Sequence, residues 1–341
     1  MLWLGGLSNL AARLSQPNRP RGYRILEYTV KIRRQPSVNL VVSGKSVDLK
    51  QIFKTPNPII GVVHLQPLPT SPRWGGNLKA IIGRAEQEAT ALASGGANGI
   101  IVENFFDAPF AKDSVDPAVV SAMTLVVERL TNLVTLPIGI NVLRNDAHSA
   151  IAIASCTGAQ FIRVNVLNGI MATDQGLIEG QAHQLLRYRR ELGSDVKILA
   201  DVLVKHGRPL GSPNLTTAVQ ETIGRALADA VILSGWTTGS PPNLEDLELA
   251  SAAAAGIPVF IGSGASWENI STLMQAADGV IVSSSLKRNG RIEQPIDPIR
   301  VSQFVEAARR SLSQKEREQE NRDANGSRGP TPEPGKVTSK T

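Results

Sequence analysis

Residues 58–69, PIIGVVHLQPLP, open with a short apolar run that ends at a histidine and passes into a proline-rich loop. The run Ile59–His64 is apolar at almost every position, as parallel strands are when both of their faces are buried. A similar run follows at Gly99–Glu103, after an alanine-rich stretch with helical spacing. This order of strand, helix and strand predicts a parallel βαβ unit.

The same βαβ pattern recurs as far as residue 312. Six more strand-like runs follow, at Ile138–Val142, Phe161–Val166, Lys197–Val202, Ala230–Ser234, Val259–Gly262 and Gly279–Ser283. Helical spacing is found at 77–94, 117–132, 147–157, 177–192, 216–227, 243–255, 267–276 and 298–312. Eight strands alternating with eight helices predict an α/β fold, the closed (β/α)8 TIM barrel. An open, doubly wound sheet is the alternative, but the loop after the first strand lacks the glycine-rich fingerprint of that fold.

Composition divides the chain into three parts. We expect the barrel at 56–312, a basic N-terminal extension at 1–55 and a disordered tail at 313–341, where apolar residues are almost absent. We expect the extension to be largely disordered or to form one amphipathic helix, since Trp3, Leu7, Leu10 and Leu14 share one helical face.

Charge is distributed unevenly along the chain. Residues 1–50 contain nine Lys and Arg against two Asp and Glu, and residues 311–341 contain six against five. Of the net +6 of the whole chain, residues 51–310 therefore contribute −2, which argues against nucleic-acid binding by the barrel. Cationic residues in the extension could instead attach the protein loosely to an anionic membrane surface.

The polar residues that follow the strands are the candidates for chemistry, because functional groups of such barrels lie at the carboxyl ends of the strands. Glu103 and Asp201 are candidate general acids or bases, or metal-ligating carboxylates, unless either is held in an ion pair with Arg163 or Lys205. His64 and His206 are candidate acids. The catalytic set that we predict is His64, Glu103, Asn141, Asn165, Asp201, Lys205 and His206.

The ends of the last two strands point to an anion. Gly262, Ser263 and Gly264 follow the seventh strand, and Ser284 and Ser285 follow the eighth, close to Lys287. Glycine N–H groups, serine hydroxyls and a lysine are phosphate donors, and barrels often bind phosphate at these loops. We therefore expect a small phosphorylated ligand there. No metal-binding spacing is present, so no metal is predicted, and the sequence identifies no cofactor.

Several blocks of this sequence resemble the BtpA family of photosystem I biogenesis proteins, which includes SgcQ-type proteins. They are GVVHLQPLPTSPRW, VENFFDAPF, GINVLRND, FIRVNVLNG, TDQGLIEG, ILADVLVKHGRPL, IGSGASWENI and DGVIVSSSLKRNG, which together cover every strand. The chain departs from the family pattern at Thr70, Phe106, Gly207 and Ser283. A side chain at Ser283, where the family has glycine, would restrict close approach of an anion.

The resemblance implies a TIM barrel. For cyanobacteria it also implies a peripheral protein on the cytoplasmic face of the thylakoid membrane, needed for accumulation of the photosystem I reaction-centre proteins. Photosystem I components or assembly factors would be its partners, and assembly into a homo-oligomer is left open. The alternative function is that of an enzyme, an isomerase, aldolase or hydrolase acting on a phosphorylated sugar or nucleotide-like metabolite. In that case Asp201 or Glu103 would act as base and His64 or His206 as acid.

Overall fold

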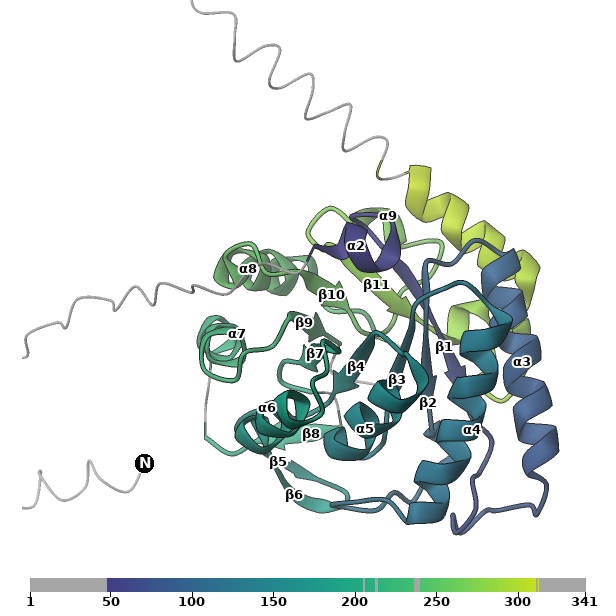
Figure 1. The fold of residues 1–341 in the computed structure, drawn as a ribbon. Coiled ribbons are helices and arrows are strands. Elements are labelled where there is room, and N and C mark those ends of the chain that lie inside the picture. Colours follow the sequence, from purple (N-terminus) through teal and green to yellow (C-terminus); the bar gives the residue numbers. More distant parts are fainter. Residues whose placement is uncertain (1–47, 205, 212–213, 236–239, 311, 313–341) are drawn as a thin grey trace, which may run out of the picture. The chain divides into compact units, whose positions relative to one another are not determined.

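Eight parallel strands close into one barrel in the computed structural model, which describes residues 48–204, 206–211, 214–235, 240–310 and 312 (Figure 1). The order around the barrel is β1-β11-β10-β9-β7-β4-β3-β2. The strands are β1 Ile59–His64, β2 Gly99–Glu103, β3 Ile138–Asn141, β4 Phe161–Val164, β7 Lys197–Asp201, β9 Ala230–Leu233, β10 Val259–Ile261 and β11 Gly279–Val282. The predicted TIM barrel is therefore confirmed. Our predictions for residues 1–47 and 313–341 lie outside the described residues.

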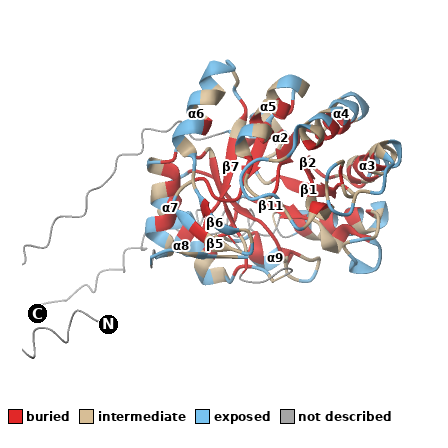
Figure 2. Ribbon diagram, turned by 90° about the horizontal axis from the view of Figure 1, so that it is seen from below, coloured by how far each residue is buried: buried red, intermediate tan, exposed pale blue. Residues whose placement is uncertain are grey.

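Helices surround the barrel and bury their inner faces against the strands (Figure 2). They are α3 Leu78–Ser94, α4 Pro117–Leu133, α5 Ala147–Thr157, α6 Ala182–Glu191, α7 Leu215–Gly224, α8 Leu244–Ala254, α9 Ile270–Leu273 and a last helix at 298–310. Five of them begin after an Asn or Asp whose side chain accepts a backbone N–H of the first turn. Such caps satisfy N–H groups that the helix itself leaves unpaired, so they explain where these helices start.

The barrel interior is filled by large side chains that lie opposite glycines. A Cβ atom on Gly139 would lie 2.2 Å from the Phe161 ring, and one on Gly279 would lie 2.4 Å from Phe260. Both rings are fully buried, so a glycine on the next strand provides the volume for each of them.

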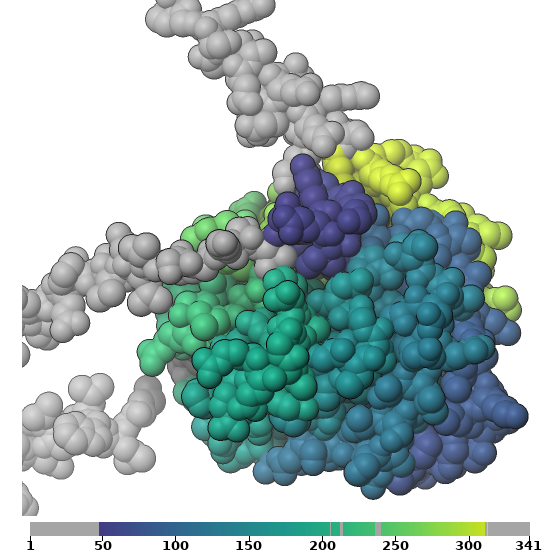
Figure 3. Space-filling view, viewed as in Figure 1, coloured from purple at the N-terminus to yellow at the C-terminus, as the bar shows by residue number. Residues whose placement is uncertain are grey.

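A short helix closes the barrel at the amino ends of its strands. It is α2 Leu49–Phe53, inside the segment that we assigned to the N-terminal extension. Leu49 and Phe53 are buried in the interior cluster, and the Phe53 ring packs edge-on against Phe161 at 5.3 Å between centroids. In Figure 3 α2 (purple) forms part of the outer surface at this end. The barrel fold therefore begins by residue 49.

The predicted helix at 177–192 was wrong in its first five residues. β5 Ile170–Thr173 and β6 Gly176–Glu179 form an antiparallel hairpin there, and β8 Gly207–Pro209 pairs with β5 on the other side. Gly169 and Gly176 have φ values of 73° and 96°, which suit a turn at each end of the β5 strand and are unfavourable in a helix. The helix α6 begins only at Ala182.

The predicted helix at 267–276 is reduced to the single turn of α9. The Asn269 side chain accepts the N–H of Ser266 and donates to the carbonyl of Gly264, at 2.8 and 2.9 Å. Asparagine side chains that bond to nearby backbone in this way compete with helix formation, and here they hold the preceding residues in a loop.

Lys287, which we expected to donate to a phosphate, is instead completely buried behind the barrel wall. Its Nζ lies 2.9 Å from Oε2 of Glu88 on α3, and Arg84 donates to Oε1 of the same carboxylate at 3.1 Å. Burial lowers the pKa of Lys287, while the Glu88 carboxylate opposes that shift. The ion pair joins the segment after β11 to α3 and so helps to close the barrel.

We expect Glu88→Gln to lower the free energy of unfolding by about 3–5 kcal/mol, because it leaves the Lys287 charge buried without a counter-charge. Urea denaturation followed by circular dichroism measures the change. The double variant Glu88→Leu with Lys287→Met should recover most of the loss, since apolar side chains replace both charges.

The matched control is Glu86→Gln on the same helix. Glu86 pairs with Arg129 at 2.9 Å, but the side chains of Arg129 and Glu86 are 61% and 28% exposed, and such partly solvated pairs contribute at most about 1 kcal/mol. Equal effects of Glu86→Gln and Glu88→Gln would contradict a structural role for the buried pair.

Candidate functional site

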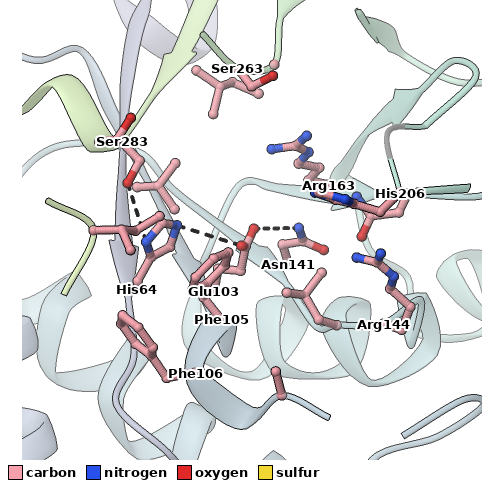
Figure 4. Close-up of a pocket in the computed structure, with 18 of the residues that line it drawn as sticks. His64, Glu103, Phe105, Phe106, Asn141, Arg144, Arg163, His206, Ser263 and Ser283 are labelled. Atoms are coloured by element: carbon pink, nitrogen blue, oxygen red, sulfur yellow. Dashed lines mark hydrogen bonds and ion pairs between the residues drawn. The ribbon is translucent and has the colours of Figure 1, made fainter. Parts of the chain in front are cut away.

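The carboxyl ends of the barrel strands surround one cavity of about 680 Å³. This volume is within the range of about 300–1,000 Å³ that is common for small-molecule sites. Ten of the predicted residues line it: His64, Glu103, Asn141, Asn165, His206, Gly262, Ser263, Gly264, Ser284 and, as the suggested ion-pair partner, Arg163. Figure 4 shows that several of them point toward a common space from different strands. We call this space the mouth cavity.

Two buried side chains hold the loops around the mouth cavity. Asp107 accepts the N–H of Leu68 at 2.7 Å and the side-chain amide of Asn104 at 3.0 Å. Asn104 in turn accepts the N–H of Leu143 at 2.7 Å. Burial raises the pKa of the Asp107 carboxyl, and these hydrogen bonds work against that shift. The network ties together the segments that follow β1, β2 and β3, so it fixes the position of the residues beside it.

Glu103 and His64 form the centre of one side of the mouth cavity (Figure 4). Asn141 donates to Oε2 of Glu103 at 2.7 Å, and Nε2 of His64 lies 3.7 Å from Oε1. On the other side of the imidazole, Nδ1 lies 3.4 Å from Oγ of Ser283. The Phe105 ring stacks on the imidazole with 4.3 Å between centroids. A carboxylate and an imidazole held in this way inside a cavity are suited to proton transfer.

Asp201 has a different environment. Arg163 donates to both of its oxygens at 2.8 Å, and Asn165 donates to Oδ2 at 2.9 Å. Burial tends to lower the pKa of Arg163, but Asp201 more than compensates and raises it, so the guanidinium keeps its charge. This arrangement is the ion pair with Arg163 that the sequence analysis gave as the alternative to a role of Asp201 as base.

The remaining predicted residues divide between the cavity and other places. Asp201 does not line the mouth cavity, so the prediction that it acts as base is not supported. Ser285 donates its hydroxyl to the carbonyl of Ala265 and lies outside the cavity lining, which removes it from the phosphate set. His206 lines the cavity and is exposed. Lys205 lies outside the described residues.

The glycines after β10 have a packing role that we did not expect. A Cβ on Gly262 would lie 2.5 Å from the side chains of Ile232 and Ser234, and one on Gly264 would lie 2.1 Å from the nitrogen of Pro241. The N–H of Gly262 donates to Leu233 at 2.7 Å and is not available to a ligand. By contrast, among the described residues no acceptor faces the N–H groups of Ser263, Gly264 and Ser284.

Sequence reasoning missed part of the cavity lining. Phe105, Phe106 and Phe110 line it from the segment after β2, and Arg73 lines it from the segment after β1. The close spacing of three phenylalanines was a visible signal. Arg144, which lines the cavity from the segment after β3, was already a candidate as one of the polar residues that follow the strands. Asp174, 3.8 Å from Arg144, comes from the β5–β6 hairpin that we had not predicted.

Within the described residues, no group of three His, Cys, Asp or Glu side chains is arranged to hold a metal ion. The same residues include no helix with the length and apolar character needed to cross a membrane.

Solved structures with a similar fold are only distantly related in sequence. A designed cube-shaped protein cage, made by fusing symmetric oligomeric domains, is 17% identical, with a TM-score of 0.50 over 80% of this chain and 79% of that chain. N-(5'-phosphoribosyl)anthranilate isomerase from Pyrococcus furiosus is 17% identical, with a TM-score of 0.45 over 74% of this chain and 99% of that one. At such identities the likeness concerns the fold alone.

Relatives in sequence are much closer. The photosystem I biogenesis protein BtpA of Synechocystis sp. is 76% identical over 269 residues, which cover 79% of this chain and 94% of that protein. An uncharacterized protein of Pyrococcus furiosus is 46% identical over 73% of this chain and 93% of its own length. The sgc region protein SgcQ of Escherichia coli is 28% identical over 76% and 96%. The profile described as BtpA family matches residues 55–310, and the chain therefore belongs to the BtpA family.

Proposed function

We propose that this chain is a biogenesis or stability factor for photosystem I, attached peripherally to the cytoplasmic face of the thylakoid membrane in a cyanobacterium. The observation that carries the proposal is the 76% identity to the Synechocystis protein of that name, over nearly all of that protein's length. Its partners in this role are photosystem I components or their assembly factors.

The proposal includes a small phosphorylated ligand in the mouth cavity. It is supported by the N–H groups of Ser263, Gly264 and Ser284, which have no acceptor among the described residues, and by the hydroxyl of Ser284. The Ser263 hydroxyl donates to the carbonyl of Ser240 at 3.4 Å. Arg73 and Arg144 line the same cavity and add positive charge. Backbone N–H groups and guanidinium groups are common phosphate donors in proteins.

The second candidate function is that of an enzyme acting on this ligand. It is favoured by the contacts of Glu103 with Asn141 and His64, because a scaffold would gain nothing from a buried carboxylate and imidazole that face a cavity. In this function Glu103 takes a proton from the ligand and His64 supplies one. The two functions are compatible, since a biogenesis factor can act through a reaction.

Expression of the chain in a Synechocystis strain that lacks its BtpA protein should restore accumulation of photosystem I reaction-centre proteins, measured by immunoblot of isolated membranes. A strain that stays deficient although the chain accumulates to the level of the native protein would contradict the proposed function.

Two substitutions in the same strain distinguish a functional role of Glu103 from a structural role of Asp201. Glu103→Gln should keep the hydrogen bond from Asn141 and the melting temperature, but should fail to restore photosystem I, since the negative charge at the cavity is lost. Asp201→Asn should instead lower the free energy of unfolding by about 3–5 kcal/mol, because Arg163 then lacks its counter-charge. Full restoration by a stable Glu103→Gln protein would show that this carboxylate has no role in function.

Deletion of residues 1–47 tests membrane attachment through the basic extension. The deletion removes eight Lys and Arg but spares α2, which closes the barrel. We expect the shortened protein to move from the membrane fraction to the supernatant after centrifugation, as cationic residues near anionic lipid contribute about 1 kcal/mol each. Unchanged sedimentation of the shortened protein would show that the extension is not the anchor.

A further inference from the structure

The phenylalanines of this chain fall into two groups. The sequence contains seven, and four of them, Phe53, Phe161, Phe260 and Phe304, are buried in the core. The other three, Phe105, Phe106 and Phe110, are partly exposed, and all three line the mouth cavity. Every phenylalanine that is not used to build the barrel core is therefore used at the mouth.

These three phenylalanines follow β2 in the chain and line the mouth cavity, and we call them the aromatic wall. Phe105 and Phe106 meet edge to face at 5.3 Å between centroids, and Phe106 also meets the edge of the His64 ring. The guanidinium of Arg144 lies 5.7 Å from the centre of the Phe110 ring. Figure 4 shows Phe105 and Phe106 on the same side of the cavity as His64, and Arg144 on the other side. The cavity thus combines aromatic rings with a cation that faces one of them.

Contact between partly exposed phenyl rings and water is unfavourable. A ligand surface that covers the rings removes this contact and is therefore bound more tightly. Burial of apolar surface is favourable in proportion to its area, and offset or edge-to-face ring contacts add to this. A ligand made only of phosphate and hydroxyl groups offers little apolar surface to such a wall. A planar ring offers a large one.

The polar groups at the same cavity indicate which hydrogen-bonding groups a ligand would need. Asn165 Oδ1 is buried and accepts no hydrogen bond from any described residue. Glu103, a carboxylate, also faces the cavity and can accept but not donate. A ligand with N–H or O–H donors on its polar edge would satisfy the Asn165 acceptor, which is costly to bury without a hydrogen bond.

We infer that the mouth cavity takes a phosphorylated molecule with a planar heteroaromatic ring, whose ring packs against Phe105, Phe106 and Phe110. The inference rests on the phosphate site proposed above and adds the chemical class of the rest of the ligand. The phosphate contacts Ser263, Gly264 and Ser284, and N–H groups on the ring edge reach the acceptors of the cavity. Ligands of two kinds share this chemistry, mononucleotides and phosphorylated pyridine compounds.

Isothermal titration calorimetry on the full chain tests the inference with five probes. Adenosine 5'-monophosphate, uridine 5'-monophosphate and pyridoxine 5'-phosphate carry a ring, whereas ribose 5-phosphate and inorganic phosphate do not. We expect at least one ring-bearing probe to bind about 10-fold more tightly than ribose 5-phosphate, the ratio expected from stacking of one ring on an aromatic side chain. Which probe binds best distinguishes a nucleotide from a pyridine compound.

The variant Phe106→Leu ties this preference to the aromatic wall. It should reduce the preference for the ring-bearing probe by about 5-fold or more and leave the affinity for ribose 5-phosphate unchanged. The matched control is Leu249→Ala, which removes a half-exposed apolar side chain on α8, away from the cavity, and should change neither affinity. Melting temperatures verify that both variants fold.

Two kinds of result overturn the inference, and they are distinguishable. If ribose 5-phosphate binds as tightly as every ring-bearing probe, or if Phe106→Leu leaves the ring preference intact, the aromatic wall does not select a ring, although the phosphate site stands. If no probe binds, inorganic phosphate included, the phosphate site itself is refuted and the inference with it.

Discussion

The parallel register of β1, β2 and β3 is the constraint on which the site depends. It pairs His64 with Glu103 and Glu103 with Asn141, so the last residues of three strands, far apart in sequence, become lateral neighbours. Barrel closure through β1 and β11 brings Ser283 to the other side of the same histidine. Each of these contacts requires the correct ladder, because a shift by one residue would turn the side chains to the opposite face of the sheet. The geometry of the mouth cavity and that of the barrel are therefore one property of this fold.

Much of the fold could be predicted from the sequence because the barrel strands are continuous apolar runs separated by helical spacing. Ile59–His64 and Gly99–Glu103 were predicted with the bounds that the structure has. The β5–β6 hairpin was not predicted, since it is a short local excursion whose apolar face covers only a small satellite cluster around Met171 and Ile178. The role of α2 was also hidden, because it depends on a contact between Phe53 and Phe161, which no local pattern reveals.

The candidate site, too, was predicted only in part from the sequence. Placement at a strand end predicted which residues share the mouth cavity, but it could not separate two carboxylates with similar sequence positions. Glu103 accepts from a neutral amide and lines the cavity, whereas Asp201 is held by two nitrogens of a buried guanidinium. Lys287 was misassigned for a related reason, since its partner Glu88 lies 199 residues away in the chain. Long-range charge pairing decides these roles, and the sequence pattern does not contain it.

Membership in the BtpA family and the chemistry of the mouth cavity together support one account, in which a TIM barrel serves photosystem I biogenesis through a ligand bound at its mouth. A crystal structure of the full chain, grown in millimolar inorganic phosphate, tests the existence of that site most directly. The account predicts tetrahedral density within hydrogen-bond distance of the N–H groups of Ser263, Gly264 and Ser284. Density for water alone in the mouth, or phosphate bound only elsewhere, would contradict it.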